Sequence, residues 1–318
     1  MTELKKAELP EVTSAYCEAL WEQVCNWGRW GDDDQAGALN LITPAKRAAA
    51  LSLATAGEVI GLGNLWPVAP TPDNPWPAQH RMVRAGDAGP YPGYPDLNVA
   101  LDYVGVECHG VATSHVDALC HVFVGGRMYN GYAATEVKST GAERNDVMPM
   151  ADGVVTRGVL LDIPRLRGLP YLPPDDRISI ADLEAAETRQ NVRVEEGDVL
   201  IVHLGREARV VAEGQFNSGE GLAGLHPECI GWFYERGVAM LGSDGMNDPQ
   251  PNWNAPGWPI PVHYLGICGM GMTLMHNLET ARLADRLSAA SRGAFLFALA
   301  PLKVPGATGS PANPLAIF

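Results

Sequence analysis

Four short apolar runs after residue 150 constrain the fold of this chain more than any other feature. They are rich in Val, Leu and Ile and are bounded by Gly, Asp or Pro: GVLLDI (158–163), GDVLIVHLG (197–205), VAMLGSDG (238–245) and FLFALAPLKV (295–304). Runs of this length are typical of buried strands. Helical patterns alternate with them: SIADLEAAETRQ (179–190), HPECIGWFYERG (226–237) and LETARLADRLSAAS (278–291). Because the order follows no regular βαβ rhythm and no GxGxxG follows a strand, the sequence predicts a mixed α/β fold without a nucleotide-binding doubly wound sheet.

The N-terminal part of the chain, about 1–60, is predicted to be helical. Helices are expected over 12–25 and 43–56. The second has Thr43 as N-cap and a proline in its first turn, and the glycine after residue 56 should end it.

The whole chain, 1–318, is expected to form a single domain, because nothing after the early Pro-rich stretch resembles a linker. That stretch, about 66–97, is long for a structureless segment inside a compact fold, so we interpret it as a lid or an oligomer arm. A surface excursion without a role is the alternative. The ending TGSPANP (308–314) has turn residues and no ionisable group, which indicates a structural tail packed on the body or on a partner subunit.

Composition excludes several classes of partner. The formal charge is −14, from 37 acidic against 23 basic residues, and the basic residues form no run. Neither nucleic acid nor an anionic membrane surface is therefore an expected partner, whereas a small-molecule substrate is. The N-terminus lacks the apolar stretch of a signal peptide, and the six cysteines show no CxxC pair. These features predict a cytoplasmic protein with reduced thiols.

The stretch ECHGVATSHVDALCHVF (107–123) gathers three of the eight histidines. If the chain there is extended, His115 and Asp117 share one face, and His109 has the same parity further along. The segment after Asp117 resembles the first turn of a helix, with Asp117 as N-cap and His121 one turn on. A strand-to-helix junction would then bring His115, Asp117 and His121 together.

Neutral imidazole and carboxylate are ligands that Zn²⁺ and Mn²⁺ both accept. A nearby histidine that does not bind the metal can act as general base or acid, since its ordinary pKa lies near 7. These residue types in this spacing therefore indicate a metal or acid/base site. A polar network with all its hydrogen bonds satisfied inside the core is the alternative.

At these residues the sequence resembles the putative cyclase family of metal-dependent hydrolases, which includes kynurenine formamidases, isatin hydrolases and trans-dienelactone hydrolases. The family signature is H-x-G-T-H-x-D-x-x-x-H, and the window from Val111 to His121 keeps its later His, its Asp and its final His. Val111 replaces the first His. His109 lies two residues earlier and could compensate, although two residues along a strand span roughly 6.5 Å. Segments such as WGDDDQAGALNLITP and PIPVHYLGICGMGMTLMHNL are also similar to the family.

This resemblance implies a mixed β-sheet with a barrel-like core of the swivelling β/β/α type and flanking helices. It implies a metal-dependent hydrolase that cleaves a small cyclic amide, a lactone or a related amide with metal-activated water. His121 matches the catalytic histidine of the family, which acts as general base. Members are commonly oligomeric, so a homodimer or homotetramer is expected.

The resemblance also supplies distal metal ligands. In the formamidases a distal His and a distal Glu, about a dozen residues apart, complete the site. The matching region here contains His263 and His276, so imidazole stands where the carboxylate is expected. This replacement favours one Zn²⁺ or Mn²⁺ ion, held by residues drawn from His115, Asp117, His263 and His276. His109 is a candidate for metal or substrate binding.

Four further residues are candidates for the substrate pocket: Trp66, His203, His226 and Asp244. Packing is the alternative for the first two, a helix start for His226 and a turn for Asp244. Trp27 and Trp30 could likewise line an aromatic pocket or pack in the core.

Two other functions remain open from the sequence. A metal-dependent cyclase or lyase of secondary metabolism would keep the same site. A non-catalytic binding protein on the same scaffold would explain the loss of the first signature His. Serine hydrolases and P-loop enzymes are disfavoured, because neither GxSxG nor a Walker A loop occurs.

Overall fold

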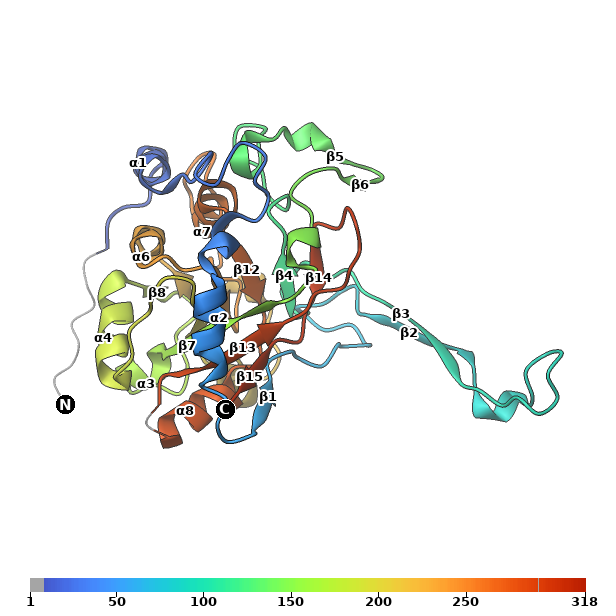
Figure 1. Ribbon diagram of the computed structural model, residues 1–318. Coiled ribbons are helices and arrows are strands. Elements are labelled where there is room, and N and C mark those ends of the chain that lie inside the picture. The colour runs from blue at the N-terminus through green and yellow to red at the C-terminus, as the bar shows by residue number, and fades with distance from the viewer. Residues whose placement is uncertain (1–8, 291) are drawn as a thin grey trace.

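The computed structural model describes residues 9–290 and 292–318 (Figure 1). A nine-stranded mixed sheet curls into a half-barrel at its centre, which confirms the expected fold class. In spatial order the sheet comprises β1 (Val59–Gly61), β15 (Leu315–Ile317), β13 (Ala294–Leu299), β7 (Val154–Asp162), β9 (Val199–His203), β11 (Met240–Ser243), β12 (Thr273–His276), β4 (His115–Asp117) and β14 (Gly309–Pro311). Its central strands β7, β9, β11 and β12 are parallel to one another, and the strands outside them pair antiparallel.

The alternation of side chains along the central strands divides the apolar residues into two cores. In β9, Leu200 and Val202 pack on one side of the sheet, whereas Val199 and Ile201 pack on the other. Each of the four apolar runs contributes a largely buried strand, as predicted, and in β13 the face of Phe295, Phe297 and Leu299 packs in the core while Ala294 and Ala298 on the other face are partly exposed.

Helices flank this sheet (Figure 1). They are α1 (Ser14–Val24), α2 (Pro44–Leu51), α3 (Ile163–Arg167), α4 (Ile180–Gln190), α5 (Arg206–Glu213), α6 (Glu228–Arg236), α7 (Pro261–His263) and α8 (Ala281–Ala290), and a π-helix (Tyr264–Met270) continues α7. Within the described residues none is long and apolar enough to cross a membrane. Position 291, the last residue of a predicted helix, and residues 1–8 of the N-terminal part lie outside the described residues.

The helix predicted over 43–56 is shorter than expected. Thr43 caps it and Pro44 begins it, as predicted, but it ends at Leu51. The Ser52 hydroxyl donates to the Ala49 carbonyl at 2.7 Å, which offers that carbonyl an alternative to the helical ladder. The glycine at 57 is therefore not the helix stop.

The stretch around the clustered histidines is less regular than predicted. Only residues 115–117 form a strand, and residues 109–113 are bends. The expected helix after Asp117 is absent from the described structure, and a turn takes its place. The backbone N–H of Ala118 donates to Thr308 and that of Cys120 donates to Asn145, so both are bonded to distant segments.

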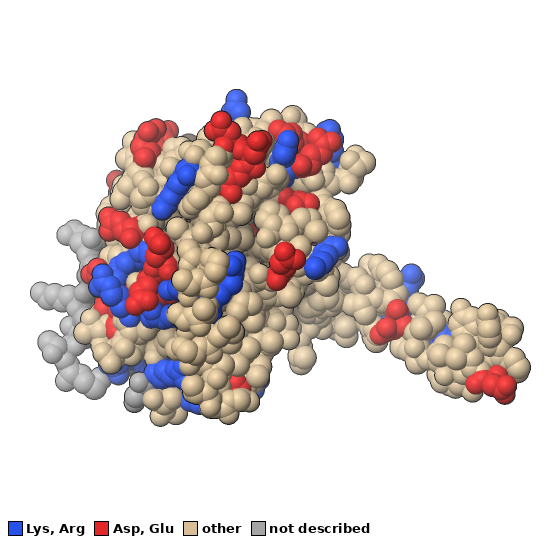
Figure 2. All heavy atoms as spheres, viewed as in Figure 1, with Lys and Arg blue, Asp and Glu red and all other residues tan. Residues whose placement is uncertain are grey.

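The Pro-rich stretch forms an arm that projects from the body (Figures 1 and 2). Its shaft is an antiparallel hairpin of β2 (Gln79–Arg84) and β3 (Leu101–Gly105). We call residues 64–108 the arm. Its surface is mostly uncharged in Figure 2. Two further pairs of short strands lie elsewhere: β8 (Arg177–Ile178) with β10 (Gly224–Leu225), and β5 (Val137–Lys138) with β6 (Gly141–Ala142).

The C-terminal tail packs on the body, as one of the two predicted alternatives has it. It contributes β14, which pairs with β4, and β15, which pairs with β1 and β13. The tail therefore forms part of the sheet that carries the clustered histidines.

Candidate metal site

Strand β4 places His115 and Asp117 on the same face. Val116 between them points the other way, into the core, as the period of a strand requires. Its neighbours set the register: His115 lies opposite His276 of β12, and Asp117 opposite Gly309 of β14. The His115 and His276 rings are 4.9 Å apart, so this pairing joins two segments that are far apart in sequence.

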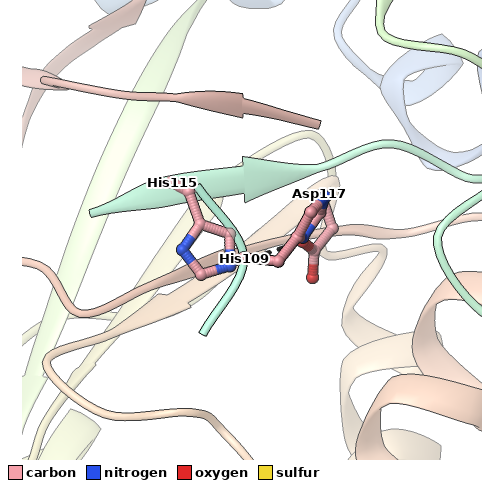
Figure 3. Close-up of side chains that lie close together, drawn as sticks. All are labelled: His109, His115 and Asp117. Atoms are coloured by element: carbon pink, nitrogen blue, oxygen red, sulfur yellow. Dashed lines mark ion pairs between the residues drawn. The ribbon is translucent and has the colours of Figure 1, made fainter. Parts of the chain in front are cut away.

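His109 reaches Asp117 from the loop before β4 (Figure 3). Its Nδ1 lies 3.0 Å from Asp117 Oδ1, and its Nε2 lies 3.0 Å from the Thr308 hydroxyl. The bend at Gly110, which has a φ of +133°, folds the chain back after His109. The separation expected for two positions along a strand therefore does not apply, and His109 reaches the Asp117 carboxylate although it lies two residues before Val111.

His115 is held by one nitrogen and presents the other. Its Nδ1 donates to the Thr113 carbonyl at 2.8 Å, and its Nε2 lies 3.5 Å from Asp117 Oδ1. Burial lowers the pKa of His115 to about 3, against the opposing effect of Asp117. The ring is thus neutral at pH 7, with Nε2 free to act as a ligand.

His121 lies at the more open edge of the cluster, with 26% of its side chain exposed. Its ring stacks on that of His109 at 4.0 Å, and its Nε2 lies 3.9 Å from Asp117 Oδ1. Burial lowers the pKa of His121 to about 4, with Asp117 acting in the opposite direction. It is therefore also neutral at pH 7.

The other carboxylate oxygen of Asp117 belongs to a closed hydrogen-bond network. His276 Nε2 donates to Asp117 Oδ2 at 2.8 Å, while Asn247 Nδ2 donates to His276 Nδ1 at 3.1 Å. His263, at the end of α7, stacks on His276 at 4.8 Å and donates from Nδ1 to Asp248 at 2.6 Å. Burial lowers the pKa of His276; burial also acts to lower that of His263, but the Asp248 hydrogen bond and charge raise it overall.

Asp117 is fully buried and remains ionised. Burial raises its pKa, but the effects of His276, His121 and His109 outweigh burial and hold the pKa well below its usual range. No well-aligned hydrogen bond reaches Asp117 Oδ1 or the facing Nδ1 of His109, although both atoms are buried and lie 3.0 Å apart. Two orphaned buried atoms that could both serve as ligands fit a bound cation.

The ligand atoms fall into two overlapping groups. His109, His115 and Asp117 form one, and Asp117, His263 and His276 form the other, with the atoms of each group within 4.8 Å of one another. Imidazole and carboxylate in these numbers fit a divalent transition metal such as Zn²⁺ or Mn²⁺.

Comparison with known families gives this geometry a context. The family model described as putative cyclase matches residues 51–247, more than half of the chain, and this range includes the segment from His109 to His121. The chain belongs to the putative cyclase family. A search of curated proteins found no match.

Solved structures resemble this chain over most of its length. A crystal structure of a novel cyclase is 28% identical, has a TM-score of 0.83, and aligns with 93% of this chain and 100% of that chain. An isatin hydrolase bound to the product analogue thioisatinate is 18% identical (TM-score 0.59, 85% and 95% covered). A predicted metal-dependent hydrolase from Bacillus stearothermophilus is 17% identical (TM-score 0.52, 82% and 98% covered). The last two similarities concern the fold.

The structure brings together six of the predicted residues and places the other four elsewhere. His203 contacts Thr280 at 2.7 Å, and His226 contacts the Pro10 carbonyl at 3.1 Å. Asp244 accepts three backbone N–H bonds at the start of α5. It also lines a cavity of about 610 Å³ that contains none of the six clustered side chains.

The three tryptophan candidates are half-buried. Trp66 lies at the root of the arm, between Leu65 and Pro67, which line the same cavity. Trp27 donates from Nε1 to the Cys268 carbonyl at 2.7 Å and packs edge-on against another indole at 5.5 Å. The Arg29 guanidinium lies 4.7 Å from the Trp30 ring.

Sequence reasoning missed several residues that support the cluster. Asn247 and Asp248 follow β11 within the segment SDGMND, only a few residues after the predicted Asp244. Polar residues just beyond a buried strand were the available signal. Thr308 carried no such signal, because its contact with His109 depends on the pairing of β14 with β4.

Proposed function

We propose that this protein is a metal-dependent hydrolase that cleaves a small cyclic amide, a lactone or a related small amide. The observation that carries the proposal is the group of His109, His115 and Asp117, in which the neutral His115 ring and the His109 ring both approach a buried carboxylate oxygen that has no well-aligned hydrogen bond. Membership of the family supports it. The names of the structural neighbours, an isatin hydrolase and a predicted metal-dependent hydrolase, are consistent with it.

We assign one divalent ion, Zn²⁺ or Mn²⁺, to His109 Nδ1, His115 Nε2 and Asp117 Oδ1. The remaining ring nitrogens of both histidines are already anchored, on Thr308 and on Thr113, which fixes the orientation of each ring. Three protein ligands leave a position open for water or substrate. A divalent ion held there would polarise a substrate carbonyl and lower the pKa of a coordinated water.

The ligand set differs from the expectation based on the formamidases. His276 already uses both ring nitrogens, one toward Asp117 and one toward Asn247. Binding an ion would require it to give up the Asp117 hydrogen bond. We therefore assign His276 to the support of Asp117, with His263 stacked on it and held at Nδ1 by Asp248, and we propose His109 as the ligand in their place.

His121 is the proposed general base. It is neutral at pH 7 and more exposed than His115 or His276, so it can accept a proton from the attacking water. It can then return that proton to the leaving nitrogen or oxygen. The fixed ring of His109, stacked against it, limits the orientation of the His121 imidazole.

The test combines metal analysis with a substrate screen. Purified protein should contain about one Zn or Mn per chain by plasma mass spectrometry, and His115→Ala should lose it. His121→Asn should keep the metal but lose turnover by roughly 10²- to 10⁴-fold on any lactone or cyclic imide that the wild type opens. A wild type that stays metal-free after addition of Zn²⁺ and Mn²⁺ would contradict the hydrolase proposal and favour a binding protein. Ring-closed or eliminated products would favour a cyclase or lyase instead.

We also propose that the arm joins copies of the chain into a homodimer or homotetramer. Large apolar side chains on it are exposed, including Trp76 at 75% and Tyr94 at 61%. A lone two-stranded hairpin is marginal in water, so burial of these exposed side chains against a second copy would stabilise the arm. Light scattering should give a dimer or tetramer for the wild type and a smaller species for the Trp76→Ser/Tyr94→Ser variant. A monomeric wild type would contradict this assignment.

A further inference from the structure

We propose that Arg206 is a positioning residue, which fixes the loop before β4 so that His109 faces Asp117. The inference rests on the proposed function, in which His109 is a metal ligand. Arg206 is the first residue of α5 and contacts none of the proposed ligands. Its action on the site would therefore be indirect, through the backbone of residues 108–114.

The Arg206 guanidinium is largely buried and bonded at both terminal nitrogens. Its side chain is 13% exposed. Nη2 donates to the Val111 carbonyl at 2.6 Å, and Nη1 donates to Asn277 Oδ1 at 2.8 Å. Val111 is the position where the family signature has its first His. At this position the Val111 carbonyl, and not the side chain, makes the contact with Arg206.

Asn277 forms hydrogen bonds with two further carbonyls of the same loop. Its Nδ2 donates to the Gly110 carbonyl at 2.8 Å and to the Thr113 carbonyl at 3.1 Å. The residue has a φ of +53° directly after His276, a conformation that asparagine tolerates better than most residues. Since Arg206 orients the Asn277 amide, the two side chains together fix three carbonyls of a loop that has no strand partner in the described structure.

The same guanidinium also binds the part of the arm that precedes the hairpin. Nη2 lies 2.7 Å from Asp73 Oδ2 and 3.1 Å from the Ser218 hydroxyl. Asp73 precedes the hairpin and Val111 follows it, so Arg206 joins the chain segments on the two sides of the hairpin. A lysine cannot reproduce this arrangement, because one ammonium lacks the planar spread of the guanidinium.

The decisive experiment compares Arg206→Ala and Arg206→Lys with Arg209→Ala. Arg209 is a matched control: it lies on the same helix, its side chain is 12% exposed, and it donates to the Gly221 carbonyl, away from the loop. Affinity for Zn²⁺ and Mn²⁺ is measured by competition with a chelator. Both Arg206 variants should weaken binding by roughly 10- to 100-fold, as loss of an outer support of a metal ligand typically does, and Arg209→Ala should not.

A double variant separates positioning from general damage. If Arg206 acts through His109, Arg206→Ala should weaken metal binding in the wild type and have little further effect in a His109→Ala background. Equal losses in both backgrounds would overturn the proposal, as would unchanged affinity in Arg206→Ala. Asp73→Asn, which keeps the shape of the Arg206 partner, provides a milder variant if Arg206→Ala does not fold.

Hydrogen exchange distinguishes failure of this proposal from failure of the proposed function. Amides of residues 108–114 in the metal-free protein should exchange faster in Arg206→Ala than in Arg209→Ala. If the wild type binds no metal, the hydrolase proposal fails and the exchange rates still decide whether Arg206 holds the loop. Unchanged exchange in that loop would overturn the positioning role whatever the metal result.

Discussion

The two sides of Asp117 differ in how their histidines are bonded. On the Oδ1 side, His109 and His115 are each anchored from behind and turn one nitrogen toward an oxygen that accepts no hydrogen bond. On the Oδ2 side, His276 is bonded through both nitrogens. We therefore describe an open side, where Asp117 Oδ1 faces histidine nitrogens without a well-aligned hydrogen bond, and a closed side, where Asp117 Oδ2 and the His276 ring are hydrogen-bonded.

This difference separates two uses of the same residue type. Buried polar atoms without partners carry a free-energy cost that a bound cation would offset, so the open side is arranged for a ligand. A satisfied network contributes to rigidity without a ligand, so the closed side fixes the carboxylate that both sides share. Substitutions on the open side should mainly lower metal affinity, and those on the closed side should mainly lower stability.

Replacement of the shared residue should have the largest effect. Asp117→Asn removes the only carboxylate of both ligand groups and the negative charge that favours a cation. Metal affinity should fall by more than the roughly 100-fold typical of losing an outer support. Mass spectrometry of dialysed protein should detect almost no metal, with thermal unfolding showing that the fold persists. A variant that retains about one ion per chain would remove Asp117 from the site.

Single substitutions on each side test the division directly. His109→Ala should lower metal affinity more than His276→Ala does. His276→Ala leaves Asp117 Oδ2 without its hydrogen bond, whereas Asn247 Nδ2 keeps the Met275 carbonyl, so the free energy of unfolding of the metal-free protein should fall by roughly 1–3 kcal/mol for the carboxylate. Chelator competition and urea unfolding give the two values. The opposite ranking would mean that the ion sits on the closed side, as the resemblance to the formamidases implied.

Two histidines of the cluster, His115 on the open side and His263 beside His276, should also respond to acid in opposite ways in the metal-free protein. Burial lowers the pKa of His115 to about 3, whereas Asp248 raises that of His263. Below about pH 6.5 the unfolded chain protonates His115 and the folded chain does not, so this residue lowers stability as pH falls. His263 contributes in the opposite sense, with stability present below about pH 6.5 and lost as pH rises through its folded pKa.

Urea unfolding between pH 7 and pH 4.5 checks these signs. His115→Asn should reduce the loss of stability on acidification by up to about 1.4 kcal/mol per pH unit, the value for one proton. His263→Asn should not reduce it. Equal slopes for the two variants would mean that the two rings have similar environments.

The strands and most helices could be predicted from sequence because their signals are local. Apolar runs such as 197–205 and capping residues such as Thr43 act within one element. The segment from His109 to Ser114 could not, because its bends depend on hydrogen bonds from Arg206 and Asn277, which come from other elements. Six clustered residues were predicted, but the partners that distinguish the open side from the closed side were not.

The smallest predicted effect concerns Thr308, the hydroxyl behind His109. Thr308→Val keeps the shape and removes one neutral hydrogen bond to His109 Nε2, which typically contributes about 0.5–1.5 kcal/mol. If that bond orients a ligand, metal affinity should fall by roughly 2- to 10-fold.

Thr273→Val is the matched control, since Thr273 begins the strand of His276 and its buried hydroxyl makes no hydrogen bond. That variant should leave metal affinity unchanged and stability equal or higher, because it removes a buried polar group without a partner. Similar losses of metal affinity in both variants would show that any change in packing near the cluster disturbs the ion, and the separate role assigned to the open side would then fail.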